Sequence, residues 1–268
     1  MLAFAFLFAV GVVSATFGSI VGLGGGIIIV PALMYAGPRL LGETMSTATA
    51  VGTSLTVLVF TALSSTFAFV REKKVDFQSG WLYFASSGPA AVVGASITGH
   101  IPARPFEIAF GAFMLLMAAL MTLRDRLKPA AIDWSIRRTY TDPQGRKSVY
   151  GYNVPSALAI GFAVGLISGL FGIGGGSLFV PAMVLLFRYP PHVATATSMF
   201  VIFLSSIVGS VTHWLNGEAD GFAVLALAPG ALIGGWLGAQ IVRRISGQAL
   251  LWLLRGTLVL FAIRMIIG

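Results

Sequence analysis

Long apolar runs, separated by short stretches that contain glycine, proline or charged residues, account for most of this chain. Most of them approach the length of about 20 residues that an α-helix needs to cross a bilayer, but the second run of each half, 27–36 and 177–187, is too short. We therefore predict an all-α, polytopic membrane protein in two halves, joined by the polar segment 124–152. The longer runs are residues 2–19, 47–70, 81–99 and 106–123 in the first half and 154–171, 193–215, 222–242 and 250–267 in the second.

Composition agrees with this pattern and narrows the function. Of 268 residues, 57% are hydrophobic and only 10% are charged, and the mean hydropathy is +0.91. The formal net charge of +8 does not indicate nucleic-acid binding, because the 17 Lys and Arg residues lie in short connections instead of on one face. The chain has no cysteine, which excludes a disulfide framework and cysteine-based chemistry. The first basic residue is Arg39, so we expect the first apolar run to remain as a membrane segment and not to be cleaved as a signal peptide.

A glycine-rich motif occurs at matching places in the two halves. Residues 22–26 read Gly-Leu-Gly-Gly-Gly and are followed by Val-Pro-Ala at 30–32; residues 172–176 and 180–182 repeat this arrangement with Ile173 in place of leucine. Adjacent glycines destabilise a helix, and a break inside a membrane is tolerated only where protein or a water-filled cavity receives the freed backbone groups. Paired breaks of this kind predict a binding site. The isolated glycines Gly11, Gly94, Gly161 and Gly234 are instead interpreted as points of close helix packing.

Further landmarks indicate an internal duplication. The offset between the halves is 150 at the glycine motifs, 144 at Thr53-Ser54 and Thr197-Ser198, and 140 at the prolines Pro89 and Pro229, a drift that we attribute to small loop deletions. The predicted organisation is a first transmembrane repeat at 1–127, a cytoplasmic linker at 128–152 and a second transmembrane repeat at 153–268.

The basic residues predict the orientation of these repeats. By the positive-inside rule, the connection with Arg71, Lys73 and Lys74 and the linker are cytoplasmic, whereas the turn at 216–220 in the second half carries no basic residue. Corresponding loops of the two halves therefore have swapped charge. This swap favours two inverted-topology repeats with broken, half-membrane helices at the glycine motifs and both termini outside.

A glycine break also offers an anion site, because it leaves free N–H groups and the positive end of a helix dipole at the start of the next half-helix, near Ile27 and Ser177. Inverted repeats bring the two half-helix tips together near the midplane, where one anion could be held between them. Hydroxyl groups could donate to it, although serine and threonine can also bond back to their own helix. The predicted substrate-binding residues are Gly24, Gly25, Gly26, Thr53, Ser54, Gly174, Gly175, Gly176, Ser177, Thr197 and Ser198.

Ionisable residues near the membrane receive a simpler interpretation. Arg255 is expected to extend to the cytoplasmic surface, with a role as substrate counter-charge as the alternative. His213-Trp214 resembles a pair in an interfacial belt. Any of the residues near span ends could titrate in proton coupling, and the sequence does not select among them. They are Glu43, Glu107, His100, His192 and His213.

The motifs as a group resemble the sulfite exporter TauE/SafE family of bacterial permeases. The resemblance rests on Gly22 to Gly26 with the Val-Pro-Ala that follows, the element Gly52-Thr53-Ser54-Leu55, Gly88-Pro89 with Gly94, and the counterparts in the second half. It implies secondary transport of small sulfur-containing anions, such as sulfite, thiosulfate or sulfoacetate-like organosulfonates, across the bacterial cytoplasmic (inner) membrane. The resemblance also includes Pro31 and Pro181, which match the prolines of the family's motif. The second half departs from the pattern in having Ala196 where the first has Gly52.

We therefore predict a transporter that works by alternating access around a midplane anion site, with export favoured. Its expected partners are a small anion and the lipid bilayer, with no nucleic acid, metal or cofactor, and a homo-oligomer stays open. No enzyme motif is present, since the three histidines are scattered and no nucleophile elbow occurs. Two alternatives stay open: an anion channel, and a membrane enzyme or assembly subunit without flux. The anion, its direction and the coupling ion are undetermined.

Overall fold

The computed structural model describes residues 2–41, 45–123, 134–141, 145, 147–241, 256, 259–260 and 262–267. The described chain is mostly helical, with one pair of strands between the two series of helices. In order, the elements are α1 (Leu2–Val21), α2 (Gly26–Leu41), α3 (Thr47–Arg71), α4 (Phe77–Thr98), α5 (Ala103–Leu123), β1 (Ile136–Thr141), β2 (Lys147–Tyr152), α6 (Val154–Phe171), α7 (Gly176–Leu185), α8 (Pro191–Leu215) and α9 (Gly221–Ile241).

Six of the described helices are long and apolar enough to cross a membrane, namely α1, α3, α5, α6, α8 and α9. The helix α2 contains only a shorter apolar stretch, Gly26–Tyr35, and α7 has ten residues. Many of the largest side chains on these helices remain exposed in the isolated chain, as expected where lipid covers them. The chain is a multi-pass membrane protein.

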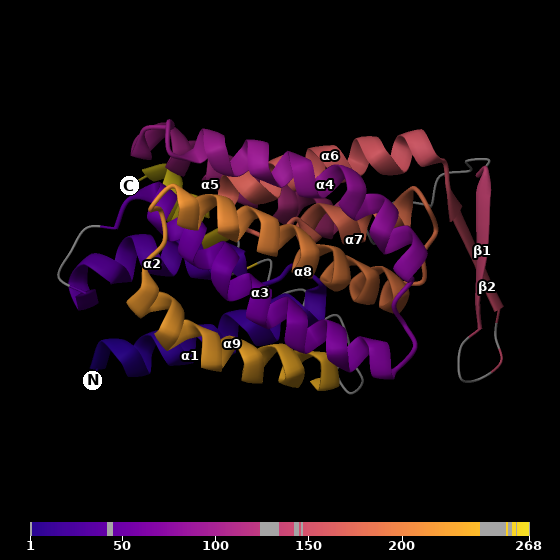
Figure 1. Ribbon diagram of the computed structural model, residues 1–268, viewed down its shortest axis with the longest axis horizontal. Coiled ribbons are helices and arrows are strands. Elements are labelled where there is room, and N and C mark those ends of the chain that lie inside the picture. The colour runs from indigo at the N-terminus through magenta and orange to yellow at the C-terminus, as the bar shows by residue number, and fades with distance from the viewer. Residues whose placement is uncertain are drawn as a thin grey trace.

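The helices run along the long axis of the molecule, which gives it two distinct ends (Figure 1). The hairpin end carries β1, β2 and the turns at 72–76 and 186–190. The terminal end carries the start of α1 and the turns at 99–102 and 216–220. The last described residues also belong to it, because the Arg104 guanidinium at the start of α5 donates to the carbonyls of Met265 (3.2 Å) and Ile266 (2.5 Å).

Helices of the first half pack against exchanged partners from the second half. The first helix of one half lies along the fourth helix of the other, so that α1 pairs with α9 and α6 pairs with α4, while α3 packs against α8. Glycines allow these close approaches: a Cβ on Gly11 would overlap the carbonyl oxygen of Leu227, and one on Gly161 would lie 2.8 Å from that of Tyr83. Gly94 and Gly234 lie equally close to opposing backbones, which confirms that these four glycines serve helix packing.

The linker departs from the predicted polar loop by forming a β-hairpin. Ile136 pairs with Tyr152 and Thr141 with Lys147 in antiparallel register. Alternation explains the strand, since Trp134, Ile136, Arg138 and Tyr140 are partly covered while the residues between them are exposed. Residues 150–152 of the second strand are buried against the hairpin end, where the Tyr150 ring lies 4.3 Å from that of Tyr189.

The matched register of the two halves continues beyond the Thr-Ser pairs. Asp76 caps the start of α4 and Asp220 caps the start of α9, again with an offset of 144. The offset falls to 140 only at Pro89 and Pro229, which lie inside these helices. The change therefore lies within a helix and amounts to about one α-helical turn of 3.6 residues, which keeps the same face toward the core. The prediction that loop deletions cause this part of the drift is wrong.

Candidate functional site

The two glycine motifs adopt the same backbone conformation. The helix α1 ends at Val21 and α2 begins at Gly26; α6 ends at Phe171 and α7 begins at Gly176. In the first motif, Gly22, Gly24 and Gly25 have φ of +77°, +83° and +93°, and their counterparts 172, 174 and 175 have φ of +70°, +73° and +71°. Side chains other than glycine rarely adopt these angles, so the sequence repeat encodes one specific turn twice.

The two turns touch each other. A Cβ on Gly26 would overlap the carbonyl oxygen of Gly172, and a Cβ on Gly176 would overlap the carbonyl oxygen of Gly22. The start of each short helix therefore lies directly against the opposite turn. Residues 21–27 and 171–176 are all buried, so the meeting point is closed at both ends of the molecule.

The serine hydroxyls connect each turn to the other half. Ser54 of α3 donates to the Gly172 carbonyl at 2.7 Å, and Ser198 of α8 lies 3.2 Å from the Gly22 carbonyl. Ser198 also lies 2.9 Å from the Thr195 carbonyl in its own helix. Both serines are fully buried. The hydroxyl of Ser54 is thus committed to the opposite turn in this conformation, and that of Ser198 is shared between the two carbonyls.

The neighbouring threonines make a second matched contact. The Thr53 hydroxyl oxygen accepts from the backbone N–H of Asp220 at 2.9 Å, and that of Thr197 accepts from the N–H of Asp76 at 3.0 Å. We call these two contacts the Thr–Asp clamps. Each clamp fixes the entry into a helix of the opposite half, because each aspartate caps that helix.

Apolar side chains surround the two turns. A Cβ on Gly24 would lie 2.8 Å from Leu58 and 3.5 Å from Ile202, and a Cβ on Gly174 would lie 3.2 Å and 3.0 Å from the same two residues. The Phe171 ring, at the end of α6, is held by three phenylalanines of α5 with ring centroids 5.3 to 5.6 Å away. Water is therefore kept away from the backbone of both turns.

The electrostatic field where the two glycine turns meet comes from backbone groups. Charged residues are absent from the sequences of α1, α6 and α7. The N-termini of α2 and α7 meet at the two turns, and among the described residues the N–H groups of Gly26 and Gly176 donate to no backbone carbonyl. Two positive helix ends in apolar surroundings favour a small anion between them.

The structure describes all of the predicted site residues, apart from the side chain of Ser177. Thr53, Ser54, Thr197 and Ser198 are all buried in contacts between halves and, apart from the additional Ser198 contact, do not bond to their own helix. Ser177 is the second residue of α7, and its side chain lies outside the part that the structure describes. The glycines Gly24, Gly25, Gly26, Gly174, Gly175 and Gly176 form the two turns themselves. Arg255 and Glu43 lie outside the described residues.

An ionic cluster at the hairpin end was not predicted. The Asp76 carboxylate accepts from the Ser79 hydroxyl (2.6 Å) and the Tyr150 hydroxyl (3.0 Å), and the Arg138 guanidinium lies 3.5 Å from it. Burial and the nearby Asp76 charge raise the pKa of Tyr150. The available signal was Asp76 three residues before Ser79, which is the spacing of a helix N-cap.

A small cavity of about 210 Å³ opens beside this cluster. Its charged side chains are mostly basic, although Glu72 pairs with Lys74 at 2.5 Å and Arg138 faces Asp76. Lys73 is exposed at its edge. The lining residues are Lys73, Lys74, Val75, Asp76, Arg138, Tyr140, Tyr150 and Val193.

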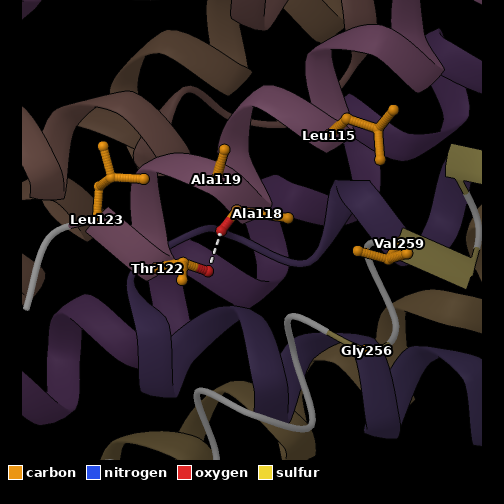
Figure 2. A pocket seen from close by; sticks show the side chains of 7 residues that line it. All are labelled: Leu115, Ala118, Ala119, Thr122, Leu123, Gly256 and Val259. Carbon is orange, nitrogen blue, oxygen red and sulfur yellow. Dashed lines mark hydrogen bonds between the residues drawn. The ribbon is translucent and has the colours of Figure 1, made fainter.

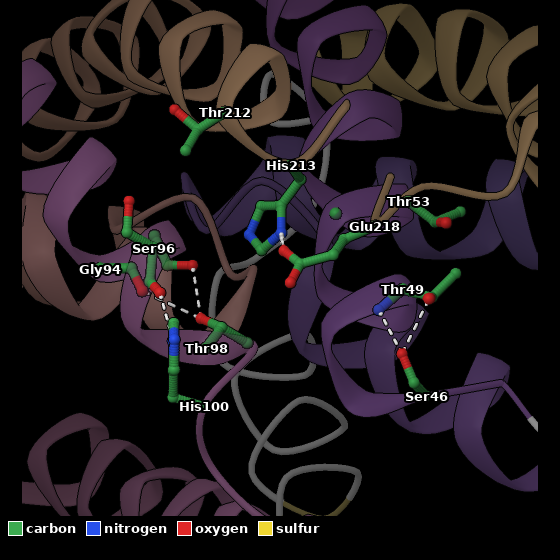
Figure 3. Close-up of polar contacts among 12 residues, drawn as sticks. Ser46, Thr49, Thr53, Gly94, Ser96, Thr98, His100, Thr212, His213 and Glu218 are labelled. Carbon is green, nitrogen blue, oxygen red and sulfur yellow. Dashed lines mark hydrogen bonds and ion pairs between the residues drawn. The ribbon is translucent and has the colours of Figure 1, made fainter. Parts of the chain in front are cut away.

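The terminal end holds a different pair. The interfacial interpretation of His213 is wrong, because this side chain is fully buried and its Nδ1 lies 2.8 Å from a carboxylate oxygen of Glu218 (Figure 3). Trp214 is half-exposed and donates to the Thr56 hydroxyl at 3.0 Å. No sequence motif predicts this pair, because it joins α8 to the turn that follows it and neither residue matches a known spacing.

A larger cavity, of about 620 Å³, lies between α5 and the C-terminal residues (Figure 2). It is lined by Leu115, Ala118, Ala119, Thr122, Leu123, Gly256 and Val259. The Thr122 hydroxyl within it already donates to the Ala118 carbonyl at 2.8 Å. An apolar lining of this kind suits lipid and does not suit an anion.

Comparison with known proteins assigns the chain to a family. A family model described as Sulfite exporter TauE/SafE matches residues 7–265. The chain is 43% identical over 267 residues to "Probable membrane transporter protein YunE" of Bacillus subtilis (strain 168), covering 99% of this chain and 98% of that protein. It is 28% identical over 255 residues to "Probable membrane transporter protein YfcA" of Escherichia coli (strain K12), covering 91% and 82%. No solved structure shows significant similarity to the chain.

Proposed function

Because the chain belongs to the sulfite exporter TauE/SafE family of membrane transporters, we propose that it is a secondary transporter of small sulfur-containing anions. The substrates we propose are sulfite, thiosulfate and organosulfonates, moved outward by alternating access across the bacterial cytoplasmic membrane. The observation that carries the proposal is the contact between the two glycine turns, where the N-termini of α2 and α7 meet in a buried, apolar environment.

The two halves, 1–127 and 153–268, are proposed to be inverted-topology repeats joined by a cytoplasmic linker at 128–152. The exchanged pairing of α1 with α9 and of α4 with α6 supports this arrangement, as do the matched Thr–Asp clamps. The hairpin end would then face the cytoplasm, in agreement with its many basic residues. Those described are Arg71, Lys73, Lys74, Arg137, Arg138, Lys147 and Arg188.

The anion is proposed to bind between the two turns. Backbone N–H groups suit a transported ion, because they attract an anion less strongly than a buried lysine or arginine and allow it to leave. The hydroxyls of Ser54 and Ser198 now contact the Gly172 and Gly22 carbonyls. We propose that they turn toward the anion when one end of the molecule opens. The other proposed ligands are Gly24, Gly25, Gly26, Gly174, Gly175, Gly176, Ser177, Thr53 and Thr197.

The closed centre supports a transporter over a channel. Both turns are buried beneath Leu58 and Ile202, and a channel needs a path that is continuous through the centre. Opening one end at a time requires the halves to move against each other. The contacts that would change are the hydrogen bonds from Ser54 and Ser198.

The experiment is counterflow in proteoliposomes that contain the purified protein. Vesicles loaded with unlabelled sulfite or thiosulfate should accumulate the labelled anion transiently and with saturation, and sulfoacetate should compete. Uptake equal to that of protein-free vesicles for every anion would contradict the proposal. A conductance without counterflow would indicate a channel.

The variants Gly25→Leu and Gly175→Leu test the site itself. Both positions have positive φ, and a Cβ would lie 2.5 Å from the Ser14 carbonyl oxygen or from a Val164 methyl group, respectively. We expect both variants to insert in the membrane and to lose counterflow. Gly37→Ala is the matched control, because Gly37 also lies in α2 and, among the described residues, no atom beyond its own helical turn lies within 4 Å of an added Cβ. Counterflow at the wild-type rate in either leucine variant would exclude the glycine turns as the site.

A further inference from the structure

His213 is the one fully buried histidine among the described residues, and only one of its ring nitrogens is satisfied. Nδ1 lies 2.8 Å from Glu218, whose side chain is 20% exposed. Nε2 has no hydrogen-bond partner within the described part of the chain. Six buried side-chain atoms in the described part of the chain lack a hydrogen-bond partner, and His213 Nε2 is the one that belongs to an imidazole ring paired with a carboxylate.

The fold itself does not require a histidine here. At the repeat offset of 144, His213 corresponds to Phe69, which is buried in the first half, and Glu218 corresponds to Lys74. A phenylalanine thus fills the equivalent space with no polar atom to satisfy. The pair occurs only at the terminal end, where its ionisable groups form a small and separate cluster.

Few charged groups surround the pair. Glu218 and Asp220 come from the same turn, and the Glu218 carboxylate lies against the backbone of Gly99, next to His100. The helix α3, which contacts the ring through Gly52, has no ionisable residue before Arg71 at its far end. The helix α9 has none, α4 has only Tyr83, and α8 has only His192 besides His213.

We propose that His213 and Glu218 form the proton-binding site that couples a proton gradient to anion transport, an inference that rests on the proposed function. The Glu218 carboxylate accepts the Nδ1–H of the neutral imidazole, which leaves the lone pair on Nε2 to take the proton. Proton uptake converts a pair of charge −1 into a neutral imidazolium–carboxylate pair, and release to water reverses this change.

The pair is joined to the second glycine turn through three consecutive residues of α3. Gly52 lies directly beneath the ring, since a Cβ there would be 2.7 Å from that of His213. Thr53 accepts from the Asp220 N–H in the same turn as Glu218, and Ser54 donates to the Gly172 carbonyl. A movement of the 213–220 segment on protonation therefore reaches the proposed anion site within one turn of helix. A Cβ at Gly52 would also overlap the Glu218 carbonyl oxygen, so the backbone of this turn accounts for the glycine at a position where the second half has Ala196.

Figure 3 shows the geometry that this coupling needs. The imidazole ring and the Glu218 carboxylate face each other between the end of α4, marked by Ser96 and Thr98, and the start of α3, marked by Thr49 and Thr53. Thr98 donates to the Leu170 carbonyl at 3.0 Å, close to the same glycine turn. The helices on both sides of the His213–Glu218 pair, α3 and α4, therefore contact the chain where α6 ends and the second glycine turn begins.

The test uses full-length protein in proteoliposomes with labelled thiosulfate, whose charge does not change near neutral pH. In His213→Gln, we expect accumulation driven by a pH gradient to fall by about 10-fold or more, within the usual range of coupling between sites. Thiosulfate-induced proton flux, followed by a trapped pH dye, should disappear. Counterflow at equal pH should stay within about 3-fold of the wild-type rate, because it needs no net proton movement.

Two further variants keep the test decisive. His213→Phe reproduces the buried residue of the other half and covers the case in which glutamine does not fold. His100→Gln removes an exposed histidine at the same end, bonded to the Ser96 carbonyl, and should keep proton-driven accumulation. Proton-driven accumulation at the wild-type level in either His213 variant would overturn the inference. Absence of counterflow in the wild type would instead overturn the proposed function.

Discussion

The two ends of the molecule share a Thr–Asp clamp, but different side chains surround the clamp at each end. At the terminal end Thr53 accepts from the Asp220 N–H, and at the hairpin end Thr197 accepts from the Asp76 N–H, with nearly equal lengths of 2.9 and 3.0 Å. Only Asp76 is also contacted by a tyrosine, Tyr150, and an arginine from the hairpin. The terminal end instead places a histidine–glutamate pair beside its clamp.

This difference distinguishes the contacts that both halves share from the side chains that occur at one end of the molecule. The clamps and the glycine turns occur in both halves, so they belong to the plan that the halves share; the clamps hold the halves together, and the turns are also the proposed anion site. In the part of the chain that the structure describes, the basic cavity lies at the hairpin end and the buried histidine at the terminal end. Groups without a counterpart are therefore the first places to look for direction and coupling.

The largest effect is expected from substitutions at the contact between the two glycine turns, which both halves share. Gly26→Ala and Gly176→Ala each drive a methyl group into a carbonyl oxygen of the opposite turn, which the backbone can relieve only by separating the halves. We expect transport to fall to background in both, with a loss of stability of about 3 kcal/mol, at the upper end of the cost of overpacking. Counterflow and thermal unfolding in detergent measure the two effects.

Equal damage from the two substitutions is the essential result. Gly37→Ala again provides the control in α2, where no described atom beyond the same helical turn lies within 4 Å of the added methyl group. If Gly26→Ala abolished transport and Gly176→Ala left it intact, the two turns would not form one site.

The second test compares the clamps directly. Thr53→Val and Thr197→Val keep the shape of the side chain and leave the N–H of Asp220 or Asp76 without its acceptor. Each should cost about 1–3 kcal/mol, the penalty for an unpaired buried group. Thermal unfolding of the two variants should shift by similar amounts, and a shift in only one would show that the clamps are not equivalent.

The third test concerns the hairpin end alone. Tyr150→Phe removes the hydroxyl that donates to Asp76 at 3.0 Å, and should cost about 1 kcal/mol. The raised pKa of Tyr150 gives this change a pH signature. The neutral hydroxyl contributes fully below pH 10.0, the ordinary pKa of a tyrosine, and its contribution is lost as the pH rises further. Wild-type stability should therefore fall more steeply above that pH than stability of the variant.

The smallest effect is expected at the cavity edge. Lys73→Gln removes an exposed charge on a flexible side chain of similar length, so stability should stay within about 0.5 kcal/mol. If the hairpin end receives the anion, the KM for thiosulfate offered at that end should rise about 2-fold at low salt and return to the wild-type value at high salt. A KM change that persists at high salt would point to a direct contact instead.

Several features followed from the sequence because they depend on local physics. Six of the eight longer apolar runs predicted helices that can cross a membrane; the run 81–99 forms α4, which is not among these helices, and the run 250–267 lies mostly outside the described residues. The packing glycines did contact opposing backbones. The glycine motifs also marked the ends of α1 and α6, because residues other than glycine rarely adopt the positive φ found at positions 22 and 172. The family followed from the same motifs.

Other features needed coordinates because they join distant parts of the chain. Nothing near Thr53 indicates that its partner is the N–H of Asp220, and nothing near Ser54 points to the Gly172 carbonyl. His213 looked interfacial because the residue beside it is a tryptophan, but burial depends on Gly52, which lies in another helix. The hairpin was missed because its alternation lies within a polar segment that charge alone marked as a loop.

The exchanged pairing also has a consequence for biosynthesis. The helix α1 is made first, but it packs along α9, where the Ser19 hydroxyl donates to the Gly235 carbonyl at 2.9 Å. Until α9 is made, the described hydrogen bonds of Ser19 to other helices are limited to the one from the Ser65 hydroxyl of α3 at 2.8 Å, and the face of α1 that packs on α9 is left to lipid. The contact between α1 and α9 therefore forms late in synthesis, and we expect a chain truncated before α9 to leave that face of α1 open to membrane proteases even though every earlier helix is complete.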